Sequence, residues 1–208
     1  MFEPLLSTIT LPQVLAHLGS VIKGFDEKPI IMGHSYGGLL TQILLQRDLG
    51  VAGMAVDGEP PAGLLPMEWS FVRSTWPAVN PLISAKNPWS MTFAQFQYAW
   101  THTLLLAEQR KAYDSIIVPE SRGLYCSDLT QDAKVDFAKP RAPLLMIAGA
   151  KDHILPASVT RTNYKAYKKS AGITELKEFP GHTHYTIVAG KGWEAVADYA
   201  LDWAAKVA

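Results

Sequence analysis

Short apolar runs alternate with amphipathic stretches in the first and last parts of the chain. The spacing of apolar residues predicts a helix over 12–23, a strand over 29–32, a helix over 39–49 and a strand over 51–56. Near the other end, strands over 143–148 and 174–179 alternate with helices over 157–169 and 193–207. Strands that alternate with helices pair in parallel through right-handed crossovers. The pattern therefore predicts an α/β fold, in which helices cover both faces of a mainly parallel sheet.

The middle of the chain, residues 59–139, does not show this alternation of predicted strands and helices. It is rich in proline and in aromatic residues, among them Trp69, Trp76, Trp89, Phe96 and Trp100. We expect a mostly helical insertion that lies over the carboxyl ends of the strands, where open α/β sheets place their ligand crevice. The expected organisation is thus a core of residues 1–58 and 140–208, with 59–139 inserted between its two parts.

Composition narrows the class of protein. A hydrophobic fraction of 48% and a charged fraction of 18% in 208 residues predict a folded domain with a sizeable core. Nineteen basic residues balance nineteen acidic ones, so charge gives no reason to expect a nucleic-acid partner or an anionic membrane surface. The single cysteine, Cys126, excludes an internal disulfide. No apolar run is long enough for a membrane span, and the start, Met1–Pro4, is unlike a signal peptide, so we expect a cytoplasmic protein.

The strongest chemical signal is the sequence Gly-His-Ser-Tyr-Gly-Gly at 33–38, between a predicted strand and a predicted helix. A serine hydroxyl is a weak nucleophile unless it is exposed, oriented and served by a base. A sharp strand-to-helix turn exposes Ser35, and we expect Gly33 and Gly37 to be required because the turn crowds the backbone. The N–H groups that begin the helix, that of Tyr36 first, would stabilise an oxyanion. The alternative is a glycine-rich turn with an incidental serine.

Two carboxylates compete for the role of the acid that orients a catalytic base. Asp152 directly follows the predicted strand over 143–148, so it should lie at the same end of the sheet as Ser35. Asp57 follows the earlier strand over 51–56 and is the rival. We rank Asp57 second because Val-Asp-Gly-Glu-Pro at 56–60 is typical of a turn, and because the order Ser, Asp, His along the chain also fits Asp152.

Two histidines compete for the role of the base. His182 and His184 both lie in the loop after the last predicted strand. Imidazole shuttles protons near neutral pH, but this chemistry does not choose between the two. A zinc site built on this pair would need a third ligand, and none stands at suitable spacing. We expect the remaining histidines to be structural or surface residues.

These three segments together resemble the α/β-hydrolase superfamily, in particular small bacterial esterases and lipases. Gly-His-Ser-Tyr-Gly-Gly resembles the nucleophile elbow, and Leu-Met-Ile-Ala-Gly-Ala-Lys-Asp-His-Ile-Leu-Pro at 145–156 resembles the acid strand and loop. Phe-Pro-Gly-His-Thr-His at 179–184 is similar to the family's histidine loop, whose last histidine is the base. The resemblance covers about residues 10–58 and 140–207 and implies that His184 is the base and that 59–139 is a helical cap.

One departure from the family concerns the start of the chain. In the family, several strands and a His-Gly loop that supplies a second oxyanion N–H precede the nucleophile, whereas here one helix and one strand precede Ser35. Loss of one oxyanion donor costs about 100- to 1000-fold in rate. We therefore expect an N-terminally shortened fold, with the nucleophile strand near an unpaired edge. The chain is either a fragment or a short form that completes its sheet as a homodimer.

The resemblance implies a serine hydrolase that cleaves carboxylic esters, with catalytic residues Ser35, Asp152 and His184. The backbone of Tyr36 would stabilise the oxyanion, and the substrate would carry an apolar acyl or aromatic group. The predicted substrate-binding residues are His34, Trp69, Trp76 and Phe96. No cofactor and no metal are expected, and a serine nucleophile argues against dehalogenation and epoxide hydrolysis. The alternatives are a lactonase, a haloperoxidase-type activity on the same triad, or an impaired remnant that acts as a binding module.

Overall fold

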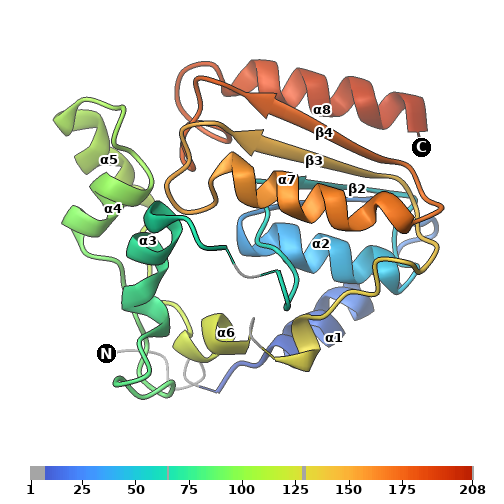
Figure 1. Cartoon of the computed structure of the whole chain (residues 1–208), viewed down its shortest axis with the longest axis horizontal. Coiled ribbons are helices and arrows are strands. Elements are labelled where there is room, and N and C mark those ends of the chain that lie inside the picture. The colour runs from blue at the N-terminus through green and yellow to red at the C-terminus, as the bar shows by residue number, and fades with distance from the viewer. Residues whose placement is uncertain (1–7, 65, 128–129, 208) are drawn as a thin grey trace.

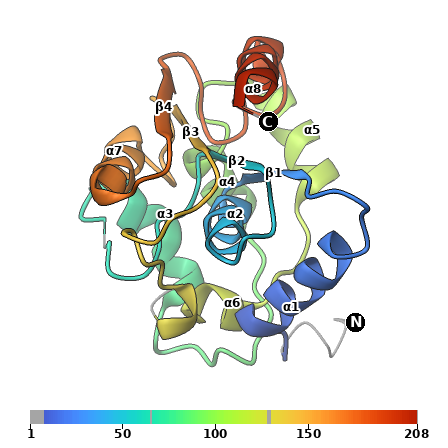
Figure 2. The same cartoon turned by 90° about the vertical axis from the view of Figure 1, so that its right-hand side faces the viewer.

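A computed structural model describes residues 8–64, 66–127 and 130–207, so the Met1–Pro4 segment considered above lies outside the described residues. Its centre is one sheet of four parallel strands in the spatial order β1-β2-β3-β4, which is also their order along the chain (Figure 2). The strands are β1 (Ile30–His34), β2 (Ala52–Val56), β3 (Leu144–Gly149) and β4 (Thr174–Phe179). All four therefore end at one side of the sheet, called here its carboxyl end.

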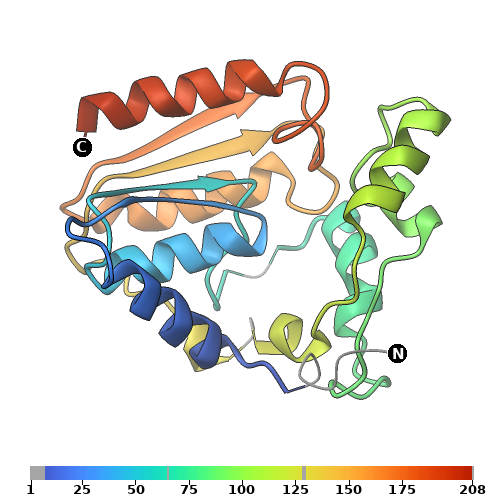
Figure 3. The same cartoon turned by 180° about the vertical axis from the view of Figure 1, so that it is seen from behind.

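Helices cover both faces of this sheet, as the apolar pattern predicts. On one face, α2 (Tyr36–Gln46) packs on β1 and β2, and α7 (Ala157–Ala166) packs on β3 and β4. On the other face lies α8 (Trp193–Val207), while α1 (Leu11–Ile22) packs on α2 at the outside of the molecule (Figure 3). The predicted class, an α/β fold with a parallel sheet, is therefore confirmed.

The central strands are buried on both faces because their side chains alternate between two apolar layers. Towards α8, Met54, Val56, Leu145 and Ile147 pack with Val196, Ala200 and Trp203. Towards α2 and α7, Ala55, Leu144 and Met146 pack with Leu45 and Tyr167. Every residue of β2 and β3 is buried, which explains why both strands read as continuous apolar runs in the sequence.

In the described residues, four α-helices and a short 3₁₀ helix (Gln131–Ala133) lie between β2 and β3 in the chain, within the predicted insertion. The α-helices are α3 (Trp69–Val79), α4 (Phe93–Ala99), α5 (Leu106–Ile116) and α6 (Arg122–Ser127). Helices α3, α4 and α5 lie beyond the carboxyl end of the sheet (Figure 1). They have a small apolar core of their own around Phe96 and Ala112. From Ala133, by contrast, the chain packs against α1 and α2, so the end of the segment 59–139 already belongs to the core around the sheet.

Several predicted boundaries differ from the observed ones. The helix predicted over 39–49 begins earlier, at Tyr36, because the turn at Ser35 passes directly into α2. The helix predicted over 157–169 ends at Ala166, and a 3₁₀ turn over Tyr167–Lys169 follows it. The strand over 174–179 and the helix over 193–207 have the predicted bounds. Within the described residues, none of the helices is long and apolar enough to cross a bilayer.

Strand β1 forms one edge of the sheet and is incompletely covered. Its residues Ile30 and Met32 face the same side as Met54, but α8 does not extend over them, and Met32 is 52% exposed. Ile31 points to the other side and packs beside α2. Within the described residues, the strand that leads to Ser35 is thus an edge strand, as expected, with an exposed apolar side chain at this edge.

Candidate active site

Ser35 lies at the turn between β1 and α2 in a strained backbone conformation. Its φ is 56° and its ψ is −122°, a region that residues other than glycine rarely adopt. The backbone is held there from both sides: the Ser35 N–H donates to the Val56 carbonyl, and the Ser35 carbonyl accepts from the N–H groups of Gly38 and Glu59. The strain and the tight anchoring are those expected of a nucleophile elbow.

Glycine is required at two positions of this turn, Gly33 as expected and Gly38 in place of Gly37. A Cβ on Gly33 would lie 2.0 Å from the Gly37 carbonyl oxygen, and one on Gly38 would lie 2.4 Å from the Cα of Gly58. A Cβ on Gly37 would meet nothing within 4 Å. The expectation that Gly37 is required for space is therefore wrong, because the backbone of Gly37, and not its side-chain position, crowds the turn.

A buried aspartate–histidine pair lies at the carboxyl end of the sheet, close to this turn. Asp152, in the loop after β3, and His184, in the loop after β4, are joined by a hydrogen bond of 2.6 Å between Asp152 Oδ2 and His184 Nδ1. Both side chains are fully shielded from solvent. Two further N–H groups, of Ile154 and Leu155, donate to Asp152 Oδ1. Burial alone would raise the pKa of Asp152, but His184 and these hydrogen bonds lower it below its usual value.

His182, the rival base, is turned away from Asp152. Its Nδ1 bonds the backbone carbonyl of Thr186 at 2.8 Å, within the same loop. Its backbone carbonyl accepts the N–H of Lys151 at 2.9 Å, which ties the loop after β4 to the end of β3. Of the two candidate histidines, the structure thus brings His184, and not His182, to Asp152.

Asp57, the rival acid, is buried next to the pair without bonding either histidine candidate. Its Oδ1 accepts the N–H of Gly149 at 2.6 Å, and its φ of 39° is another strained value. Burial, and then the neighbouring Asp152 carboxyl, raise the pKa of Asp57 well above its usual value. Two carboxyls buried side by side do not ionise together readily, so Asp57 is the one that retains a proton.

His34, directly before Ser35, packs against the base candidate. The ring centroids of His34 and His184 are 4.4 Å apart, and the ring of Trp100 stands edge-on 4.6 Å from that of His184. Burial and the nearby His184 lower the pKa of His34 to about 3, so its imidazole is neutral. His34 Nε2 and His184 Nε2 each lack a hydrogen-bond partner within the described part of the chain. Ser35 Oγ is therefore not bonded to His184 in this structure.

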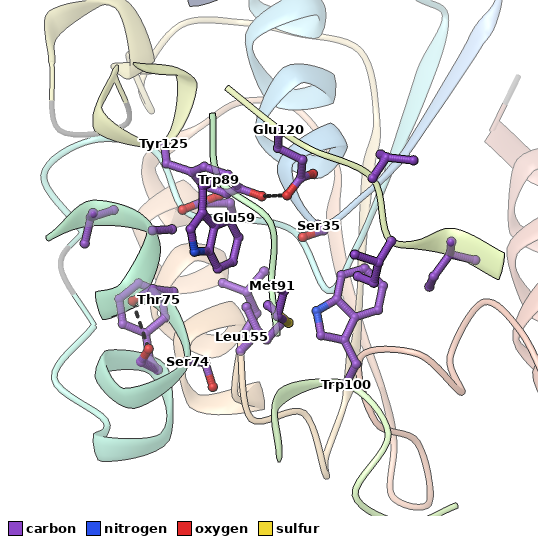
Figure 4. Close-up of a pocket in the computed structure, with 17 residues that line it drawn as sticks. Ser35, Glu59, Ser74, Thr75, Trp89, Met91, Trp100, Glu120, Tyr125 and Leu155 are labelled. Atoms are coloured by element: carbon purple, nitrogen blue, oxygen red, sulfur yellow. Dashed lines mark hydrogen bonds between the residues drawn. The ribbon is translucent and has the colours of Figure 1, made fainter. Parts of the chain in front are cut away.

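An apolar cavity of about 380 Å³ opens beside Ser35, between the sheet and the inserted helices (Figure 4). Its lining is mostly apolar and aromatic and includes Phe71, Trp89, Met91, Trp100, Ile117, Ile154 and Leu155. Ser35 and the two acidic residues Glu59 and Glu120 are polar members of the lining. The cavity joins the candidate nucleophile to a surface suited to an apolar ligand group.

The four predicted substrate-binding residues lie outside this lining. Trp69 and Trp76 are 74% and 52% exposed, because they lie seven residues apart on one face of α3 while Phe71, Ser74 and Ala78 line the cavity from another. Phe96 is wholly buried in the core of the inserted helices, and His34 packs against His184. The helical spacing of α3, once its first residue is known, is the signal that would have separated these two faces.

Comparisons with known proteins identify the family. A sequence profile described as the alpha/beta hydrolase family matches residues 4–199, so the chain belongs to the α/β-hydrolase family. No curated protein sequence gives a significant match.

Solved structures share the fold at low sequence identity. A monoacylglycerol lipase from Paleococcus ferrophilus is 19% identical, with a TM-score of 0.64 over 96% of this chain and 77% of that one. A methylesterase from Arabidopsis is 14% identical, with a TM-score of 0.64 over 95% and 79% of the two chains. A pyrethroid hydrolase from Sphingobium faniae is 17% identical, with a TM-score of 0.60 over 92% and 78%. The chain is therefore a hydrolase by family, and these likenesses extend to the fold.

The different surroundings of Gly33 and Gly37 make a testable contrast in stability. We expect Gly33→Ala to lower the unfolding free energy by about 3 kcal/mol or more, since its Cβ would overlap the Gly37 backbone. Gly37→Ala should leave stability unchanged or raise it by up to about 1 kcal/mol, because alanine favours a helix. Thermal unfolding of the two variants and the parent measures both effects. Equal losses in the two variants would contradict the assignment of the crowded contact.

Proposed function

We propose that this hydrolase cleaves carboxylic esters of small molecules by a Ser35–His184–Asp152 triad. The observation that carries the proposal is the buried hydrogen bond between Asp152 and His184, next to a strained serine that lines an apolar cavity. The esterases and the lipase among the structural neighbours support the same class of substrate. The inserted helices and their apolar lining favour an ester with an apolar acyl or aromatic group, and in this proposal residues 59–139 act as a cap.

The proposed reaction passes through an acyl-enzyme. Ser35 Oγ attacks the ester carbonyl carbon, and His184 Nε2 takes the hydroxyl proton and passes it to the leaving alcohol. Asp152 holds the Nδ1–H tautomer and stabilises the imidazolium that forms. His184 then takes a proton from water, whose oxygen attacks the acyl carbon. As the bond from the acyl carbon to Ser35 Oγ breaks, His184 returns this proton to Oγ, which releases the acid and restores the serine hydroxyl. Because Nε2 of His184 has no partner in the resting structure, it needs only to meet Ser35 Oγ when substrate binds.

The oxyanion of each tetrahedral intermediate would be stabilised by the start of α2. The Tyr36 N–H belongs to the first turn of this helix, at the positive end of the helix dipole. Ser35 itself makes no side-chain cap on α2, so its hydroxyl remains available for attack.

An active-site probe separates an enzyme from a binding module of the same fold. We expect a fluorophosphonate with an alkyl chain to add one label per chain at Ser35, because only an activated serine reacts with it. Intact mass before and after reaction measures the label, and Ser35→Ala should abolish it. Absence of labelling in the folded parent protein would overturn the proposed function in favour of the binding module.

Substitutions of the two histidines and two aspartates test the assigned roles. With a 4-nitrophenyl ester as substrate, His184→Ala and Asp152→Asn should each lower kcat/KM by about 10,000-fold, the second by favouring the wrong tautomer. The matched control His182→Ala should cost no more than about 10-fold, or 1.4 kcal/mol. Asp57→Asn should cost less than Asp152→Asn, because Asp57 accepts a backbone N–H instead of a histidine. A larger loss in His182→Ala or Asp57→Asn than in its counterpart would reassign the base or the acid.

We further propose that the free edge of β1 pairs with a second copy of the chain. The basis is the exposed apolar strip at this edge, which includes Ile30 and Met32. Light scattering on the eluting protein should give twice the chain mass, and Met32→Lys should shift it towards one chain mass, since a charge at the edge opposes pairing. A parent protein that is folded and monomeric at tens of micromolar would contradict the homodimer without affecting the triad.

A further inference from the structure

Three side chains at the carboxyl end of the sheet leave unpartnered polar atoms in one small space. One ligand atom each of His34, Asp57 and His184 lies within 4.8 Å of the other two. His34 Nε2, Asp57 Oδ2 and His184 Nε2 have no hydrogen-bond partner in the described chain. Asp57 and His184 are fully buried. An unsatisfied buried polar atom costs about 1–3 kcal/mol, so three of them together call for a ligand.

Two of these side chains are already oriented as metal ligands commonly are. His184 directs its Nδ1 to the Asp152 carboxylate at 2.6 Å, which fixes the ring and leaves Nε2 for coordination. Asp57 is fixed by the N–H of Gly149 on Oδ1, which leaves Oδ2. The imidazole of His34 is neutral, as a histidine ligand must be.

We propose that His34, Asp57 and His184 bind a divalent transition-metal ion of the zinc class, and that this ion inhibits the enzyme. Ligand atoms around a tetrahedral zinc ion at bond lengths of about 2.0–2.2 Å lie about 3.3 Å apart. The side chains would therefore need to approach one another by at most about 1.5 Å, and water would complete the fourth position.

The donor set determines which ions fit. Two imidazoles and one carboxylate suit zinc, cobalt and nickel, whereas magnesium and calcium prefer oxygen donors alone. Asp57 would give up its proton on coordination, because a carboxylate that binds a metal ion is deprotonated. The neighbouring Asp152 carboxylate, on the far side of His184, favours a divalent cation at this depth.

The inhibitory effect rests on the proposed function, whereas binding itself does not. A metal ion on His184 Nε2 occupies the lone pair that takes the proton of Ser35. Coordination and ester hydrolysis therefore exclude each other, and removal of the ion by a chelator should restore the activity. Magnesium at the same concentration should leave the activity unchanged.

Cobalt binding tests the site without reference to catalysis. After treatment with a chelator, the protein should bind one Co²⁺ per chain and give the visible absorption bands of a tetrahedral ion. His34→Phe and Asp57→Asn should each weaken this binding by more than about 10-fold. Loss of a residue that only hydrogen-bonds a metal ligand already costs about 10-fold in affinity, so loss of a ligand itself should cost more. His182→Ala and His102→Ala are the matched controls, because His102 stacks on His153 at 3.8 Å and offers the rival pair of imidazoles. Both controls should bind Co²⁺ like the parent.

A crystal soaked in Zn²⁺ covers the case in which a variant fails to fold. An anomalous zinc peak between His34, Asp57 and His184 would support the site. A peak at His102 and His153 instead, or the absence of both peak and cobalt bands, would overturn it. Cobalt binding with no inhibition of ester hydrolysis would support the metal site and overturn the proposal that the bound ion inhibits the enzyme. Binding together with an absence of fluorophosphonate labelling in the metal-free protein would refute the proposed function alone.

Discussion

A close contact between two stretches of backbone, at the end of β1 and the start of α2, holds the candidate nucleophile in place. Gly33 contacts Gly37 there, and Gly38 contacts Gly58 in the next loop. A Cβ atom on Gly33 or Gly38 would overlap the facing backbone. The contact fixes the strained conformation of Ser35 and the direction in which α2 leaves the sheet. Helix α2 in turn covers β1 and β2 and carries α1 on its outer side. Close contacts between glycines thus set both the position of Ser35 and one layer of the core.

Parallel pairing explains how distant residues reach this turn. Each of the four strands ends at the same edge, and the chain after each contributes one polar residue: Ser35, Asp57, Asp152 and His184, in the spatial order of the strands. That order alone would leave His184 at the far side, next to β4. The loop after β4 crosses back over β3 instead, held by the bond from the Lys151 N–H to the His182 carbonyl. A side chain on Gly149 would block this crossing, since its Cβ would lie 2.7 Å from the same carbonyl oxygen.

Local sequence therefore predicts much of the fold and part of the site. The spacing of apolar residues and the glycines that mark turns are local signals. They locate all four described strands and the helices around them to within a few residues. The proximity of Asp152 to His184 and not to His182 depends on the crossing of a loop, which no local signal encodes. The faces of α3 could not be assigned while its first residue was unknown, so Trp69 and Trp76 were predicted to bind substrate although they face solvent. The role of Gly38 depends on Gly58, twenty residues away, and is likewise a property of the folded chain.

The strain in the described chain is concentrated where the ionisable residues meet. Three residues other than glycine have a positive φ, and two of them, Ser35 and Asp57, lie at this site. His34, Asp57 and His184, at the same site, each carry a buried nitrogen or oxygen atom without a hydrogen-bond partner in the described chain. Such costs persist only where the surrounding structure enforces them, and here the crowded turn and the double-sided core do so. The strained backbone of Ser35 and Asp57 and the unpartnered atoms of His34, Asp57 and His184 thus lie at the same carboxyl end of the sheet as the Gly-His-Ser-Tyr-Gly-Gly sequence.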